Sequence, residues 1–109
     1  MDQAIAAAEN TGERVFEAEL HRLRGELLIQ LGRAGESEGA FRRALSVAGD
    51  QGAKLWELRA AVGLAWLLRD RRRHVEAREL LTPVYAWFTE GFDTPDLKEA
   101  KALLDELDA

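Results

Sequence analysis

Histidine, serine and cysteine side chains carry out much of the acid–base and nucleophilic chemistry of enzymes, and this chain offers few of them. His21 and His74 are the only histidines, and no serine lies at a motif that exposes a hydrolase nucleophile. The triplet His74-Val75-Glu76 matches half of a zinc-deaminase signature, but no paired cysteines follow it. We expect His21 to pack between helices or to line a groove, and His74 to begin a helix. The sequence predicts no catalytic residue and no metal site.

A second candidate is the glycine-containing stretch Gly32-Arg33-Ala34-Gly35-Glu36, which has some of the composition of a phosphate-binding loop. It lacks a preceding strand and the lysine–serine/threonine pair that grips phosphate and metal in such loops. We therefore interpret it as a turn between helices. Neighbouring carboxylates elsewhere lie among other helical charges and need no role beyond solvation. The sequence predicts a protein that is not an enzyme and has no cofactor.

One basic cluster stands out among the charges. It consists of five arginines: Arg69, Arg71, Arg72, Arg73 and Arg78. One interpretation is a solvated turn whose arginines also stabilise the C-terminus of the preceding helix. The other is a contact with an anion or an acidic partner, for example the acidic last helix of a neighbouring copy. Both interpretations stay open at the level of sequence.

The composition predicts a single all-α domain of 109 residues. Hydrophobic residues make up 47% of the chain and charged residues 32%, which is typical of a folded soluble protein. Alanine, leucine, glutamate and arginine dominate, and all four favour helices. No apolar run approaches the roughly 18 residues of a membrane span, and the first residues do not resemble a signal peptide. We therefore expect a cytoplasmic protein that has no membrane partner.

The negative charge is concentrated at one end of the chain. The formal net charge is -5, and aspartate and glutamate far outnumber lysine after residue 89. Binding to a nucleic-acid backbone requires the opposite charge. We therefore expect no nucleic-acid partner.

The sequence repeats itself after about forty residues, which is typical of stacked helical units. Five segments of the first copy recur in the second. Ala4-Ile5, Ala8, Gly12, Phe16-Glu17 and Leu27-Leu28 return as Ala44-Leu45, Ala48, Gly52, Trp56-Glu57 and Leu67-Leu68. In such arrays the surface acts in recognition, and there is no buried catalytic pocket.

Glycines, prolines and apolar spacing divide the chain into six expected helices. They cover about residues 2–10, 13–31, 36–48, 53–70, 74–89 and 95–107. Pro83 lies inside the fifth of these and predicts a kink near Glu79–Leu81. Thr94-Pro95 is a strong helix start, because a hydroxyl cap precedes a proline at the first helical position. In the second helix, leucines and Phe16 recur at spacings of three and four. We expect the last helix to cap the array with one apolar and one charged face.

Within each unit the spacing of small and large residues resembles the tetratricopeptide repeat (TPR). In the first unit the matching residues are Gly25, Leu28, Gly32, Phe41 and Ala44, with Ser37 where alanine is usual. In the second unit they are Ala65, Leu68, Ala77, Leu81 and Val84. Two positions depart from the family pattern: His21 replaces a tryptophan and Arg72 replaces a turn glycine. The resemblance implies antiparallel helical hairpins stacked as a right-handed superhelix, about two and a half units long, with a capping helix at the C-terminus.

A narrower resemblance concerns three segments: Gly12-Glu13-Arg14, residues 19–27 and residues 88–97. They are similar to the C-terminal tail of large bacterial signalling proteins that join a nucleotide-cyclase domain, a predicted ATPase and a long TPR array. This resemblance implies a regulatory role as the terminal piece of such an array. No catalytic residue carries over, because the cyclase and ATPase motifs are absent here.

The TPR resemblance also implies a binding groove, since the first helix of each hairpin lines the concave face in that family. The corresponding residues are Glu19, Arg22, Glu26, Ile29, Gln30, Arg59, Val62, Trp66, Arg69 and Asp70. Arg22 and Arg59 could pair with a peptide carboxylate, and Trp66 could supply an apolar anchor. Alternatively, Trp66 packs against the next hairpin and the arginines pair with Glu19 or Glu26. For a single arginine we favour this internal pairing.

The function expected from these observations is protein–protein recognition or scaffolding, with a protein or peptide as the partner. The alternative is a structural or regulatory end-cap that associates with itself and has no peptide ligand. The first expected helix has no hairpin partner and therefore exposes an edge that contains Ile5 and Ala8. An unpaired face in a helical array favours association with another surface. We therefore expect a homo-oligomer that forms through this N-terminal edge.

Overall fold

The computed structural model describes residues 3–89 and 94–108, with side chains from residue 16 onward. Within these ranges all regular secondary structure is α-helical, which confirms the all-α class. The helices are α1 (Gln3–Gln30), α2 (Ala34–Gln51), α3 (Lys54–Asp70), α4 (His74–Ala86) and α5 (Pro95–Leu107). None of the helices in the described part of the chain is both long and apolar enough to cross a membrane.

The number of helices corrects the expectation from sequence. The helices expected over 2–10 and 13–31 form one continuous helix, α1, so the described residues contain five helices and not six. Gly12, which lies between the two expected helices, falls inside α1. A glycine inside a helix costs only about 1 kcal/mol relative to alanine, and the residues around it can continue the helix. The side chains of Ile5 and Ala8, the expected self-association edge, lie outside the described residues.

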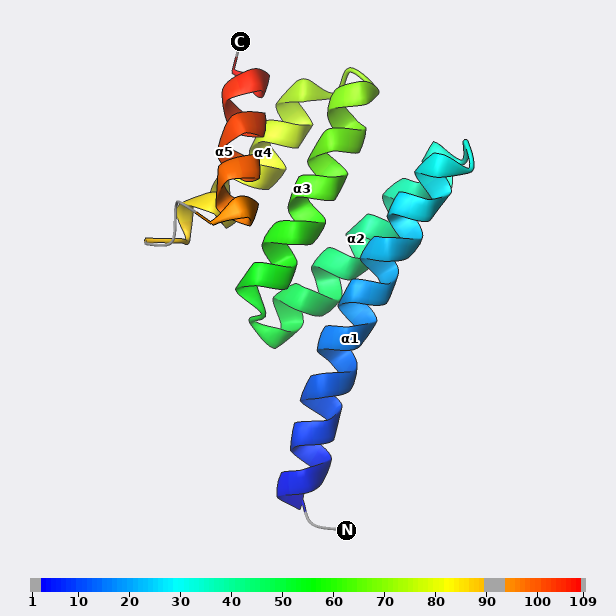
Figure 1. Ribbon diagram of the computed structural model, residues 1–109, viewed down its shortest axis with the longest axis vertical. Coiled ribbons are helices and arrows are strands. Elements are labelled where there is room, and N and C mark those ends of the chain that lie inside the picture. Colours follow the sequence, from blue (N-terminus) through cyan, green and yellow to red (C-terminus); the bar gives the residue numbers. More distant parts are fainter. Residues whose placement is uncertain (1–2, 90–93, 109) are drawn as a thin grey trace.

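The helices form two antiparallel pairs and a last helix (Figure 1). α1 packs against α2, α3 packs against α4, and α5 packs against both α3 and α4. α1, α3 and α5 follow one another along one side of the molecule, because α1 also contacts α3. The N-terminal half of α1 projects beyond the end of α2 (Figure 1). α3 contacts each of the other four helices and is the centre of the fold.

The main core lies around α3. Leu58, Leu64 and Leu68 of this helix are fully buried, and Leu81 of α4 and Leu103 of α5 are buried against the same cluster. These side chains recur at helical spacings, as a buried face requires. The core therefore unites the second hairpin and α5 around one central helix.

Phe41 of α2 is held in a slot between two glycines. A Cβ atom on Gly25 of α1 would lie 2.9 Å from the ring, and a Cβ on Gly63 of α3 would lie 2.5 Å from it. The ring is 1% exposed, so it has no free space into which to move. Next to it, the buried Ser37 hydroxyl donates a 2.7 Å hydrogen bond to the Gly25 carbonyl. These contacts bring α1, α2 and α3 into close approach.

The two turns that close α1 and α3 have the same backbone geometry. Gly32 and Arg72 both adopt left-handed conformations, with φ of 75° and 62°. The next residue, Arg33 or Arg73, donates a 2.8 Å backbone hydrogen bond to the carbonyl of Leu28 or of Leu68. The sequence repeat is thus also a repeat of conformation at these turns, even where arginine replaces glycine.

We expect Arg72→Gly to stabilise the protein by about 1 kcal/mol, because a left-handed backbone is strained for any residue with a side chain. Gly32→Ala is the matched reverse change. A Cβ atom at Gly32 would meet no neighbour within 4 Å, so only the strain of the left-handed backbone acts, and the change should destabilise by a similar amount. Urea unfolding of both variants measures the two effects. Equal stabilities of the wild type and both variants would contradict this account of the turns.

The remaining boundaries agree with the sequence to within a few residues, except that α4 ends at Ala86 rather than near 89. Pro83 lies inside α4, and the predicted kink there stays a prediction. α5 begins where expected: Thr94 is extended, with φ -72° and ψ 151°, and Pro95 follows in the first turn. The expected capping hydrogen bond to the Thr94 hydroxyl is not formed within the described residues. His74 is the first residue of α4, as expected.

Candidate partner-binding groove

A pocket of about 210 Å³ lies between α1, α3 and α5. Its walls come from three helices that are well separated in the sequence. The lining residues are Arg22 and Glu26 of α1, Leu58, Arg59, Val62, Gly63 and Trp66 of α3, and Asp96 and Glu99 of α5. The pocket therefore lies on the side of the molecule to which the TPR resemblance assigns the groove.

Half of the ten groove residues expected from the sequence line this pocket. Arg22, Glu26, Arg59, Val62 and Trp66 line it. The other five are absent from the lining: Glu19, Ile29 and Gln30 of α1, and Arg69 and Asp70 of α3. Ile29 lies farther along α1 with an exposed side chain, and Arg69 lies one helical turn beyond Trp66.

The contribution of α5 to the pocket was not expected from the sequence. Asp96 and Glu99 were not among the expected groove residues, yet both line the pocket. Treating the last helix as a third groove-lining helix, with acidic residues opposite the arginines of α3, would have indicated both residues.

Arg22 is paired within its own helix. It hydrogen-bonds to both oxygens of Glu19, with Nε–Oε2 at 3.0 Å, and its Nη1 lies 2.9 Å from Oε1 of Glu26. The hydrogen bond from Arg22 lowers the pKa of Glu19, and in turn Glu19 raises the pKa of Arg22. This is the internal pairing that we favoured from the sequence. Arg22 and Glu26 line one side of the pocket, and the two carboxylates compensate the charge of the guanidinium.

Arg59 connects α3 to α5. Its Nη2 lies 3.3 Å from Oδ2 of Asp96, and its guanidinium lies 4.7 Å from the centre of the Trp56 ring. The ion pair is partly exposed, and pairs of this kind contribute little to stability on their own. It joins Asp96, in the first turn of α5, to α3 at the pocket.

Trp66 is half-buried and is held on two sides. Its indole N–H donates a 3.1 Å hydrogen bond to Glu99 of α5, and the Arg69 guanidinium lies 4.1 Å from the ring centre. Arg69 also contacts Glu106 of α5 at 2.8 Å. The indole is therefore pre-oriented at the pocket wall, which reduces the entropy lost when a ligand packs against it.

The pocket contains charged groups of both signs and one aromatic wall, but neither histidine lines it. His21 of α1 is half-buried, and its Nε2 lies 3.5 Å from Glu17. Among the described residues, no group of three or more His, Asp or Glu side chains could hold a metal ion. The arrangement suits recognition of a partner with polar and apolar groups.

Three arginines of the basic cluster, Arg69, Arg73 and Arg78, contact acidic residues within the chain. Arg69 contacts Glu106 and Arg78 contacts Asp108 at 3.3 Å, and both acids belong to the acidic C-terminal segment. The acidic partner considered from the sequence was the last helix of a neighbouring copy, whereas these contacts are to the chain's own last helix and the residue after it. Arg71 and Arg72 are exposed at the turn, as the solvated interpretation expects.

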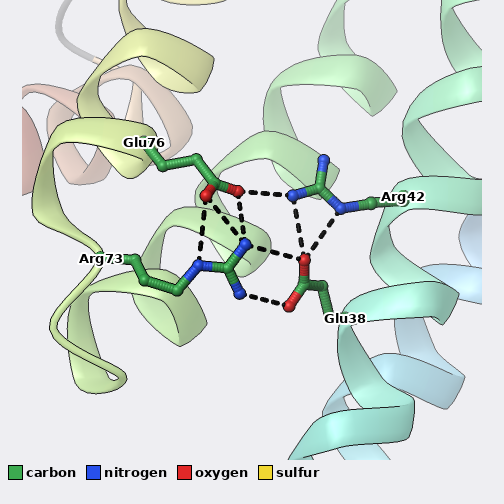
Figure 2. A network of polar contacts seen from close by, with 4 residues as sticks. All are labelled: Glu38, Arg42, Arg73 and Glu76. Atoms are coloured by element: carbon green, nitrogen blue, oxygen red, sulfur yellow. Dashed lines mark hydrogen bonds and ion pairs between the residues drawn. The ribbon is translucent and has the colours of Figure 1, made fainter.

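On α2 and α4, four charged side chains form a closed network (Figure 2). Glu38 and Arg42 come from α2, Glu76 comes from α4 and Arg73 immediately precedes α4. Arg73 lies 2.6 Å from Glu38 and 2.7 Å from Glu76, and Arg42 contacts Glu38 at 3.0 Å and Glu76 at 2.7 Å. The network joins the two hairpins through helices that do not line the pocket.

This network predicts a loss of stability in acid. Hydrogen bonds from Arg73 lower the pKa of Glu38 and of Glu76 below the ordinary value of 4.5. A carboxyl group with a lowered folded-state pKa stabilises the fold above its unfolded pKa, and that stability is lost as the pH falls through the folded pKa. As the pH is lowered below about 4.5, we expect the melting temperature to decrease. In the double variant Glu38→Gln/Glu76→Gln it should decrease less steeply. If the melting temperatures of the wild type and the double variant decreased equally steeply with falling pH, this prediction would be contradicted.

Comparisons with known proteins identify no relative. No protein-family model matches the chain, and no curated protein or solved structure matches it significantly.

Proposed function

We propose that this chain is a non-catalytic protein–protein interaction module of the TPR type. In this proposal it forms the C-terminal end of a larger helical array in a bacterial cytoplasmic signalling protein. The observation that carries the proposal is the pocket between α1, α3 and α5, which has Trp66 at its wall. The repeated turn geometry at Gly32 and Arg72 supports the assignment to a helical-repeat architecture.

The chemistry of the pocket favours a peptide segment with an apolar side chain beside groups that can hydrogen-bond. Trp66 and Val62 supply apolar surface, whereas Arg22 and Arg59 are already paired with carboxylates of the chain. A free carboxylate ligand would have to displace Glu19 or Asp96 from these arginines. The apolar contact with Trp66 therefore contributes more to affinity than ionic contacts in this proposal.

Selection of a random peptide display library against the purified chain tests the proposal. Trp66→Ala should weaken binding of the selected peptides by about tenfold to a hundredfold, the effect of losing an aromatic hot spot. Trp87→Ala is the matched control, because Trp87 is exposed on the segment after α4 and does not line the pocket. Circular dichroism checks that both variants fold. Equal binding by the wild type and Trp66→Ala would contradict the proposal.

The second candidate function is a structural end-cap that docks to itself or to a parent array and binds no peptide. It is favoured by the internal pairing of Arg22 and Arg59, which leaves the groove charges compensated without a ligand. Failure of every library peptide to bind, together with reversible self-association, would favour this candidate. Self-association through Ile5 and Ala8 stays a prediction.

A further inference from the structure

α1 carries an apolar stripe on a face that no other described helix covers. The stripe consists of Phe16, Leu20, Leu23 and Leu27, whose side chains are between 46% and 64% exposed. Their spacings of four, three and four place them on one side of the helix. From the sequence, these residues shared one helical pattern with Leu28, but only Leu28 among them is buried. An exposed apolar row of this length marks an interaction surface.

The stripe is separate from both the core and the pocket. The face of α1 that packs on α2 carries Ala18, Gly25 and Leu28, all of which are buried. The pocket uses Arg22 and Glu26, which lie on the face between the core and the stripe at 100° of rotation per residue. A partner on the stripe therefore need not contact Trp66 or α5.

We propose that the stripe pairs with the same stripe of a second copy of this chain, in antiparallel orientation. Apolar residues at alternating spacings of three and four form the seam of a two-helix coiled coil. The order four, three, four is the same when it is read in either direction along the helix. Such a row is complementary to itself under two-fold symmetry, which is the requirement for a homodimer interface.

The antiparallel pairing gives each apolar residue an apolar partner. Phe16 packs against Leu27 of the second copy and Leu20 packs against Leu23 of the second copy, and the symmetry axis repeats both layers. Glu17 and Arg24, which flank the seam, face each other across the interface with opposite charge. This interface gives the end-cap candidate a defined self-association surface and does not depend on peptide binding in the groove.

Sedimentation equilibrium of the full chain tests the pairing. Between about 5 µM and 0.5 mM protein we expect a reversible monomer–dimer equilibrium. Leu23→Glu places two like charges in the seam and should raise the dimer Kd by at least about thirtyfold. Val75→Glu is the matched control, because Val75 is an exposed apolar residue of α4 away from the stripe, and it should leave the Kd unchanged.

Charge reversal tests the orientation. Glu17→Arg or Arg24→Glu alone should raise the Kd about threefold to tenfold, and the two changes together should restore it, because the antiparallel pair is then reformed with reversed signs. Circular dichroism at each concentration establishes that all variants fold. A chain that stays monomeric throughout, or equal effects of Leu23→Glu and Val75→Glu, would overturn the proposed surface. Failure of the double reversal to restore the Kd would overturn the antiparallel pairing. Peptide binding by the same variants reports on the groove separately.

Discussion

Gly63→Ala should lower the free energy of unfolding by about 1–3 kcal/mol, which is the usual cost of overpacking a core. The added methyl group would lie 2.5 Å from Cε1 of Phe41, well inside van der Waals contact. The opposite edge of the same ring meets Gly25 of α1, where a Cβ atom would lie 2.9 Å from Cε2. The ring is closed in on both sides, so α3 has to move away from α2. Replacing glycine by alanine stabilises a helix backbone by about 1 kcal/mol. A net destabilisation therefore requires that the steric cost of the methyl group exceeds this gain.

Two further variants make this test specific. Gly39 lies inside α2, and a Cβ atom there would meet nothing within 4 Å. Gly39→Ala should therefore stabilise by about 0.5–1 kcal/mol, the opposite sign for the same chemical change. Adding Phe41→Leu to Gly63→Ala should recover part of the lost stability, because a smaller side chain makes room for the methyl group. If urea unfolding showed that both glycine variants change the free energy of unfolding in the same direction, the close packing of Phe41 between Gly25 and Gly63 would be contradicted.

Leu103→Ala should have an even larger effect, a loss of about 2–5 kcal/mol. Leu103 is fully buried, with 0% of its surface accessible to solvent, and it joins α5 to the cluster around α3. The truncation leaves a cavity under α5 and removes buried apolar area. The polar contacts of α5 do not compensate for this loss of stability. Since α5 also carries Asp96 and Glu99 to the pocket, weakening this helix should disrupt the groove.

Amide hydrogen exchange together with urea unfolding measures the loss at α5. Lys98→Ala is the control on the same helix, since Lys98 is exposed and its truncation should change stability by no more than about 0.5 kcal/mol. In Leu103→Ala the amides of α5 should exchange faster than those of α3. If both variants were as stable as the wild type, α5 would not be an integral part of the fold.

The local signals in the sequence predicted the later helices better than the first one. Thr94-Pro95 and the turn at Gly32 act within a few residues, so the start of α5 and the end of α1 could be predicted. Gly12 did not break α1, because a single glycine is a weak signal when the surrounding residues favour a helix. Arg72 adopts the left-handed backbone although it is not a glycine, so residue type alone did not predict the geometry of this turn.

The candidate site required information that spacing alone does not hold. The repeat placed Arg22, Arg59 and Trp66 on equivalent helices, and the structure brings them to one pocket. The approach of Glu99 to Trp66 depends on how α5 docks, which no local pattern encodes. Spacing also showed that Leu20 and its neighbours share a face, but not whether another helix covers that face.

The central claim, that the groove beside Trp66 binds a protein partner, has a direct test in NMR of the indole N–H groups. The chain has three tryptophans, so each indole can be followed during titration with a peptide selected from a random display library. Binding in the groove should shift the Trp66 signal, because its N–H bonds to Glu99 at the pocket wall, and leave Trp87 unchanged. Saturable binding that leaves the Trp66 signal in place would contradict the claim.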